Sequence, residues 1–177
     1  MSMLQLRCTL KVQKQLGLSP NDLSEVKEPD SLLGNWYSNI FMVDRRKTLI
    51  FMSEHTLLSF VIYGVRKDNS KKISEILLRG IDQLLLMEGF DISEINRVFS
   101  GYESVQFTKT NSRSALGNMN ELVELYKHFI LYDGGFGHCD LANIIRQINR
   151  TPQRNLGWSK SIDIVKQLLR GNAQAII

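Results

Sequence analysis

The chain is poor in cysteine, proline and histidine, and it has no long apolar run. It holds 2 Cys, 3 Pro and 3 His in 177 residues. Cys8 and Cys139 form no CxxC pair, so the sequence predicts two reduced thiols rather than a disulfide framework. The longest apolar run, around residues 57–65, is broken by Ser59 and is far shorter than the ~18 residues that a membrane span needs. The first residues, MSMLQLRCTLK, lack the apolar segment of a secretory signal, so we expect a cytoplasmic protein.

The motifs of the common enzyme classes are missing too. There is no GxSxG, no HExxH and no dinucleotide fingerprint, and the glycine-rich DGGFGH at 133–138 lacks the Lys-Ser or Lys-Thr of a Walker loop. No two histidines have metal-ligand spacing on a single element. The sequence therefore predicts no metal and no cofactor, and it leaves open whether the protein is an enzyme.

The composition is that of an ordinary globular protein. Hydrophobic residues make up 43% and charged residues 23%, which argues against disorder. A chain of this length is expected to fold as a single domain over residues 1–177.

Two periodicities divide the chain into strands and helices. Alternating, aromatic or β-branched runs predict strands over 4–8, 36–43, 48–52, 56–63 and 104–108. In the run at 56–63, Thr56 could equally cap a short buried helix. Helical spacing predicts a short helix at 10–16 and longer ones at 73–85, 91–99, 115–130, 141–148 and 162–169. We expect an α+β fold, with a small antiparallel or mixed sheet from the N-terminal half packed against about five helices.

The helix at 115–130 is the most regular, and its beginning is unusual. Thr110, Asn111 and Ser112 offer side-chain oxygens that can cap its first free amides. Most helices place an acid in the first turn, whereas this one has Arg113 there and no acid before Glu121. A positive helix end with free N–H groups suits a phosphate or a carboxylate.

Gly117 and Asn120 lie on the same face of this helix as Arg113, roughly opposite the apolar face. Gly117 costs about 1 kcal/mol relative to Ala, which suggests that something approaches the backbone there. One interpretation is a ligand site. The other is a well-packed helix with an arginine on its solvent side and a glycine facing a neighbouring element.

Further cations lie elsewhere in the chain. The formal net charge is +4, but residues 141–177 contain six cations and one acid, a local balance of +5. Such asymmetry favours an acidic partner, nucleic acid first, although a solvated basic face explains it nearly as well. Arginine binds phosphate with two parallel hydrogen bonds. The predicted anion-binding set is Asn111, Arg113, Ser114, Gly117, Asn120, Arg45, Arg46, Lys47, Arg150 and Arg154.

Other roles are also considered for individual residues. Arg45 and Arg46 could instead pair with surface carboxylates such as Asp44 or Glu54. Glu54 and His55 follow a predicted strand and are the candidates for a general base or acid if the site is catalytic. Cys139, next to His138, is expected to be a loop thiol.

Several stretches resemble an uncharacterised bacterial domain family of unknown function. They are MLQLRCT, EPDSLLGNWYSNIFMVDRRKTLIF, HTLLSF, FTKTNSRSALGNMNEL and INRTP, which cover most of the chain. The family shows similar Trp-Tyr, Asp-Arg-Arg-Lys and Asn-Arg-Ser-x-Leu-Gly-x-Met-Asn patterns. Here the last pattern begins at Asn111 with one extra residue, Ser112, before Arg113. The resemblance implies a coherent fold and no particular activity.

Three hypotheses for the function follow. The first is a binding module for a phosphate-rich partner, nucleic acid or nucleotide. The second is a metal-independent nuclease or nucleotide-processing enzyme that uses Glu54 or His55. The third is an interaction protein of a plasmid- or phage-related system, whose basic face docks on an acidic protein.

Overall fold

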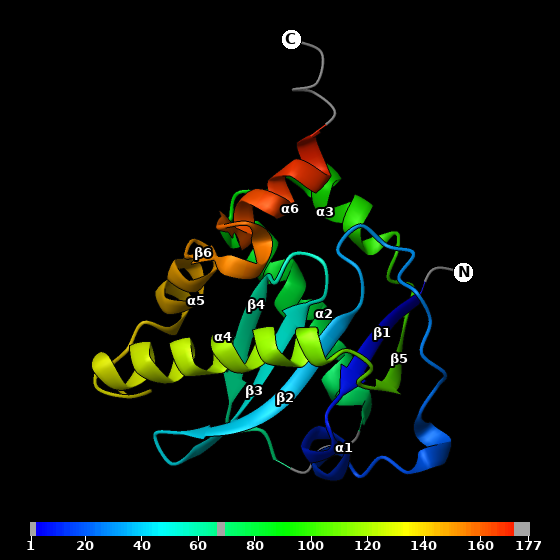
Figure 1. Ribbon diagram of the computed structural model, residues 1–177, viewed down its shortest axis with the longest axis horizontal. Coiled ribbons are helices and arrows are strands. Elements are labelled where there is room, and N and C mark those ends of the chain that lie inside the picture. Colours follow the sequence, from blue (N-terminus) through cyan, green and yellow to red (C-terminus); the bar gives the residue numbers. More distant parts are fainter. Residues whose placement is uncertain (1–2, 67–69, 172–177) are drawn as a thin grey trace.

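The computed structural model describes residues 3–66 and 70–171. A mixed sheet of five strands stands at the centre, with helices on both of its faces (Figure 1). The predicted α+β class and mixed sheet are confirmed.

The sheet has the strand order β4-β3-β2-β1-β5. The central strand β1 is parallel to both β2 and β5, whereas β2, β3 and β4 form an antiparallel meander. Four strands come from the N-terminal part as predicted, and β5 joins them at the far edge. The strands are β1 (Met3–Cys8), β2 (Trp36–Val43), β3 (Arg46–Ser53), β4 (Ser59–Tyr63) and β5 (Ser104–Lys109).

A tight turn joins β2 to β3. Asp44 and Arg45 both have positive φ, 49° and 59°, which is the conformation that a two-residue turn needs to match the twist of the strands. The strands predicted at 36–43 and 48–52 are confirmed, and they form a hairpin. Its turn is shorter than predicted, since Arg46 and Lys47 already belong to β3.

Predicted capping residues mark the start of α3 and the end of α1. Asp91 and Glu94 cap the start of α3 reciprocally, and Gly17, with φ of 66°, ends α1. The strand predicted at 56–63 is confirmed over Ser59–Tyr63, while Thr56 lies in the turn before β4. The helices are α1 (Leu10–Leu16), α2 (Ser70–Met87), α3 (Ile92–Phe99), α4 (Arg113–Tyr132), α5 (Leu141–Asn149) and α6 (Ser161–Arg170), with 3-10 turns η1 (Pro20–Asp22) and η2 (Arg154–Leu156).

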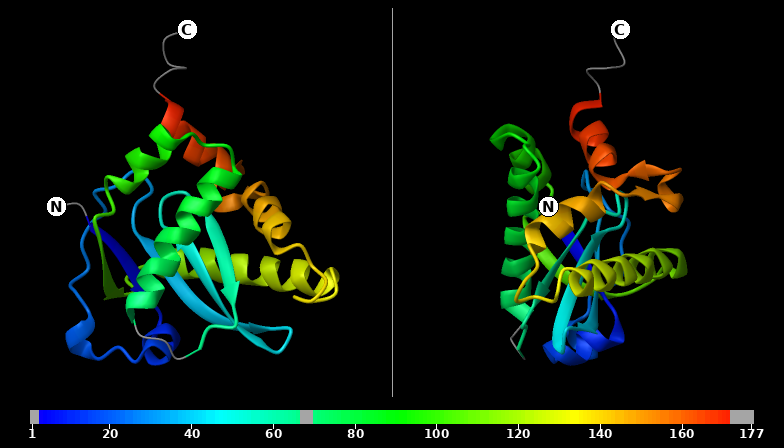
Figure 2. Two further views of the ribbon diagram at one scale, coloured as in Figure 1. Left: turned by 180° about the vertical axis from the view of Figure 1, so that it is seen from behind. Right: turned by 90° about the vertical axis from the view of Figure 1, so that its left-hand side faces the viewer.

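Each face of the sheet has its own core. On one face, residues such as Leu4, Leu6 and Phe51 pack with α2, and on the other, Tyr37 and Met52 pack with α4. Figure 2 shows α2 and α4 on opposite sides of the sheet. A sheet buried on both faces hides both sets of alternating side chains, including any polar ones.

Among the described residues, no helix has the length and apolar character needed to cross a bilayer.

Candidate anion-binding site

The central strand β1 carries a buried arginine. Its even-numbered residues face the α2 side, so Gln5 and Arg7 face the other side. The connection between α1 and β2 runs beside β5, where the Ser24 N–H donates to the Phe107 carbonyl, and its next residues bond to the Gln5 and Arg7 side chains. As a result, Arg7 is only 1% exposed.

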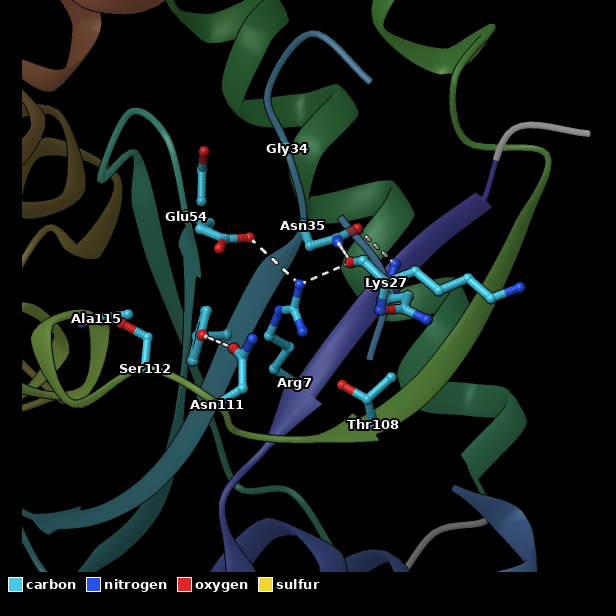
Figure 3. A network of polar contacts seen from close by, with 12 residues as sticks. Arg7, Lys27, Gly34, Asn35, Glu54, Thr108, Asn111, Ser112 and Ala115 are labelled. Carbon is cyan, nitrogen blue, oxygen red and sulfur yellow. Dashed lines mark hydrogen bonds and ion pairs between the residues drawn. The ribbon is translucent and has the colours of Figure 1, made fainter. Parts of the chain in front are cut away.

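Side chains from the sheet hold this connection in place. The Gln5 Nε2 donates to the Glu25 carbonyl at 2.8 Å, and the Lys27 N–H donates back to Gln5 Oε1 at 2.9 Å. The Lys27 carbonyl then accepts from Asn35 Nδ2 at 3.2 Å and from Arg7 Nη2 at 2.9 Å. The guanidinium of Arg7 is thereby fixed between the connection and the sheet (Figure 3).

Arg7 is only partly satisfied by the protein. Its Nη2 lies 3.7 Å from Glu54 Oε2, a distance for an ion pair but not for a hydrogen bond. Within the described residues, Arg7 Nε and Nη1 have no hydrogen-bond partner, and neither has Glu54 Oε2. A buried donor left without a partner costs about 1–3 kcal/mol, more if charged. Such groups are uncommon in folded proteins, and an anionic ligand is one explanation for them.

Tyr37 and Asn111 connect Arg7 to the start of α4. The guanidinium carbon lies 5.9 Å from the centre of the Tyr37 ring, and the Tyr37 hydroxyl donates to Asn111 Oδ1 at 2.6 Å. Burial raises the pKa of Tyr37, which outweighs the lowering effect of Arg7, so the phenol keeps the proton it donates. Because Asn111 Oδ1 accepts this bond, the side-chain amide nitrogen of Asn111 is the group that can donate to a different partner. Figure 3 shows Arg7 with Asn111 and Ser112 on one side and Lys27 on the other.

The first turn of α4 has the predicted character. Ser112 is the N-cap, and its hydroxyl accepts from the Ala115 N–H at 3.1 Å. The first turn has no acidic residue, and Arg113 and Ser114 are exposed. The positive end of the helix is therefore neither neutralised by an acid of its own nor covered.

Gly117 faces open space. A Cβ built at this position would have nothing within 4 Å among the described residues, so no neighbouring element requires the glycine. The structural interpretation of Gly117 as a packing contact is therefore wrong. Asn120, on the same face, is also exposed.

The cations of the β2–β3 hairpin lie at the opposite end of α4. Just before this helix, Asn111 is bonded to Tyr37 of β2, and just after it, the Phe136 N–H donates to Asp44 Oδ2 at 2.9 Å. A helix of 20 residues is about 30 Å long. The structure therefore does not bring Arg45, Arg46 and Lys47 together with Arg113.

Asp44 and Glu54, the carboxylates considered as partners of Arg45 and Arg46, contact other groups. Glu54 pairs with Arg7, and Asp44 accepts from the Phe136 N–H. The guanidinium of Arg46 lies over the Tyr63 ring at 5.2 Å.

The basic C-terminal region is partly neutralised by acids from earlier in the chain. Both terminal nitrogens of Arg150 donate to Glu88, whose side chain is fully buried, and Arg146 lies 3.5 Å from the same carboxylate. Arg170 pairs with Glu94. Of the predicted residues here, Arg150 is thus held by an internal ion pair. Arg154 is exposed, and the neighbouring Asn155 bonds to Asn118 of α4.

Glu54 and His55 point to different neighbours. The Glu54 side chain is 23% exposed and reaches Arg7, whereas the His55 ring packs against Gly34. A Cβ at Gly34 would lie 2.9 Å from the ring. No group of three or more His, Cys, Asp or Glu side chains that could hold a metal ion occurs in the part of the chain that the structure describes.

The residue that sequence reasoning missed is Arg7. The alternation at residues 4–8 correctly predicts a strand, but it groups Arg7 with the polar residues and so gives no sign that Arg7 is buried. A strand in the middle of a sheet is covered on both faces, and a charged residue there needs a reason. The parallel neighbours of β1 could not be predicted from its own sequence.

Comparisons with known proteins identify a family and a fold. The family model described as a domain of unknown function, DUF6933, matches residues 5–164. Among solved structures, the chain is similar to the catalytic core domain of BIV integrase, with a TM-score of 0.51 and 9% identity. That similarity covers 78% of this chain and 97% of the other. At such low identity only the fold is shared. No curated protein sequence matches.

Proposed function

The chain belongs to the DUF6933 family of domains of unknown function, and we propose from its own site that it is a binding module for a phosphate-bearing partner, a nucleotide or a nucleic acid. The phosphate binds at the start of α4. Arg113, Ser114 and the amide of Asn111 provide exposed donors, and Arg7 provides a cation behind them.

The observation that carries the proposal is the state of Arg7. This guanidinium is 1% exposed, and two of its nitrogens have no partner in the described structure. Removing an arginine from water without satisfying it is unfavourable, so the site is incomplete as a purely structural ion pair. An oxyanion placed between Arg7 and the free amides of α4 supplies the missing acceptors.

Phosphate fits better than an apolar ligand or a metal ion. Glu54 is the one acid among the residues assigned to the site, the acceptors Asn111 Oδ1 and Ser112 Oγ already have donors, and the helix end adds partial positive charge. In Figure 3, Glu54 and Asn111 both lie on the side of Arg7 away from Lys27, and Glu54 pairs with the guanidinium at 3.7 Å.

A fluorescence-anisotropy titration with labelled oligonucleotides tests the proposal. We expect binding at low salt that weakens steeply as salt rises, because phosphate contacts release counterions. Arg113→Ala is expected to lower affinity by roughly 1–3 kcal/mol, with a shallower salt dependence. Arg45→Ala, an exposed arginine at the other end of α4, is the matched control and is expected to bind as the unmodified chain does.

Two results contradict the proposal. One is no binding of nucleotides or oligonucleotides at low salt. The other is an equal loss in Arg113→Ala and Arg45→Ala, because that result places binding on general surface charge rather than on this site.

A catalytic role for the same site has one observation in its favour. Glu54 Oε2 has no hydrogen-bond partner in the described structure and lies beside Arg7, so it is available as a proton acceptor. Under this second hypothesis, nucleotides or nucleic acid are turned over in the presence of a chelator. The turnover then disappears in the double variant Glu54→Ala His55→Ala. Binding without turnover in the unmodified chain selects the binding module.

A further inference from the structure

A small hairpin on the same side of the sheet as α4 presents a tryptophan to solvent. The hairpin consists of β6 (Pro152–Gln153), η2 and β7 (Ser159–Lys160), with Pro152 paired to Lys160. The Trp158 N–H donates to the Gln153 carbonyl at 2.9 Å, and Leu156 packs against the core beneath α4. The backbone around Trp158 is therefore fixed to the body of the protein.

Trp158 has a solvent exposure and a backbone conformation that are both unusual for a tryptophan. Its side chain is 68% exposed, whereas the other tryptophan, Trp36, is fully buried. Its φ is +65°, in the left-handed region that bulky residues rarely adopt because it is sterically strained. A large exposed aromatic ring on a strained backbone is neither core nor ordinary surface.

The surroundings of Trp158 are basic. Arg154 and Lys160 are exposed, the hairpin contains no acid, and Asp163 belongs to the first turn of α6. No ion pair engages either cation among the residues that the structure describes. An aromatic ring flanked by free cations is complementary to a base and its phosphates.

The hairpin is attached to α4 close to the proposed phosphate site. Asn155 Nδ2 donates to Asn118 Oδ1, in the second turn of α4. At 1.5 Å per residue, this contact is about 7.5 Å along the helix from Arg113. Gly117, next to Asn118, faces open space. The right-hand view of Figure 2 shows the hairpin and α4 on the same side of the sheet.

We propose that Trp158 is a stacking platform for a base of a single-stranded nucleic acid, with Arg154 and Lys160 contacting the backbone. The inference rests on the proposed function, because the adjoining phosphate binds at the start of α4. Single strands are favoured over duplexes since only an unpaired, unstacked base offers its face to a side chain. They are favoured over an acidic protein because stacking uses the ring and the cations together.

The two tryptophans make the test specific. The probes are a short oligodeoxythymidine, the same strand annealed to its complement, and inorganic phosphate. We expect the single strand to quench the fluorescence of Trp158, while buried Trp36 keeps its emission. Phosphate is expected to compete with the strand without quenching Trp158 by itself.

Variants separate stacking from folding and from phosphate binding. Trp158→Ala is expected to lower affinity for the single strand roughly 5- to 150-fold, the range for loss of one stacked base. Trp158→Phe keeps a ring and is expected to retain most of the affinity. Tyr132→Ala is the matched control, because Tyr132 is 81% exposed but lies at the far end of α4. Phosphate affinity should be the same in all three variants.

The outcomes distinguish this inference from the function on which it rests. Unchanged single-strand affinity in Trp158→Ala, or equal affinity for single strand and duplex, overturns the stacking role even where Arg113-dependent phosphate binding persists. If neither phosphate nor oligonucleotide binds to the unmodified chain, the proposed function and this inference both fail. The stacking role is also overturned if the chain binds a partner protein and binds no nucleic acid.

Discussion

Replacing Arg7 by methionine separates a binding role from a structural one. Methionine fills a similar unbranched path through the core but carries no charge. The change removes the hydrogen bond from Nη2 to the Lys27 carbonyl and the ion pair with Glu54 at 3.7 Å. It also removes two nitrogens that have no partner in the described structure.

The opposing contributions to stability nearly cancel. The lost hydrogen bond from a charged donor is worth about 1.5–3 kcal/mol, whereas each unpartnered buried donor costs about 1–3 kcal/mol. The Glu54 side chain is 23% exposed, so leaving it without Arg7 costs less than for a fully buried carboxylate. We therefore expect the free energy of unfolding to change by less than about 2 kcal/mol. Affinity for inorganic phosphate should fall roughly tenfold or more, since a charge-assisted bond is lost.

Arg150→Met is the matched control. Arg150 is held by Glu88, whose side chain is fully buried, so its removal leaves a carboxylate that water cannot reach. Arg146 still lies 3.5 Å from that carboxylate, which places the expected cost near the lower end of about 3–5 kcal/mol. Phosphate affinity should not change.

Urea-unfolding curves and phosphate calorimetry on the two variants give the comparison. If Arg7→Met costs as much stability as Arg150→Met while phosphate still binds normally, Arg7 is a structural residue and the reasoning is refuted.

Three further predictions concern other parts of the chain. Ser112→Ala removes the cap of α4 and should lower the free energy of unfolding by about 1 kcal/mol; an unchanged urea midpoint contradicts this. Arg170 and the Asp91 amide hold the pKa of Glu94 at about 2, so Arg170→Ala should raise it, which carboxyl NMR titration measures. Because this pKa is depressed, the stabilisation from the pair is complete above about pH 4.3 and is lost as pH falls toward 2. Burial raises the pKa of Cys8 to about 12, so iodoacetamide at pH 8 should label Cys139 well before Cys8; equal labelling rates contradict this.

Local signals in the sequence were sufficient for most elements. Thr9 and Gly17 bound α1, Ser112 caps α4, and the polar residues around Asp44 mark the β2–β3 turn, all as their types predict. These signals act over a few residues, so they do not depend on the tertiary structure.

Contacts between residues that lie far apart in the sequence were not predicted. The charge asymmetry of residues 141–177 suggested a free basic face, but Glu88, directly after α2, and Glu94 of α3 neutralise part of it. The same limit hid Arg7, which is buried only because residues 24–27 cross over β1. The hairpin of β6 and β7 was not predicted either, since strands of two residues leave no periodicity to read.

A backbone and arginine NMR titration with inorganic phosphate tests the central claim most directly, using sodium chloride of equal ionic strength as the control. The account predicts that phosphate shifts the amide resonances of Arg113 and Ser114 together with the Nε–H of Arg7, and that chloride does not. Shifts confined to surface cations such as Arg45, with Arg7 and the start of α4 unmoved, would contradict it.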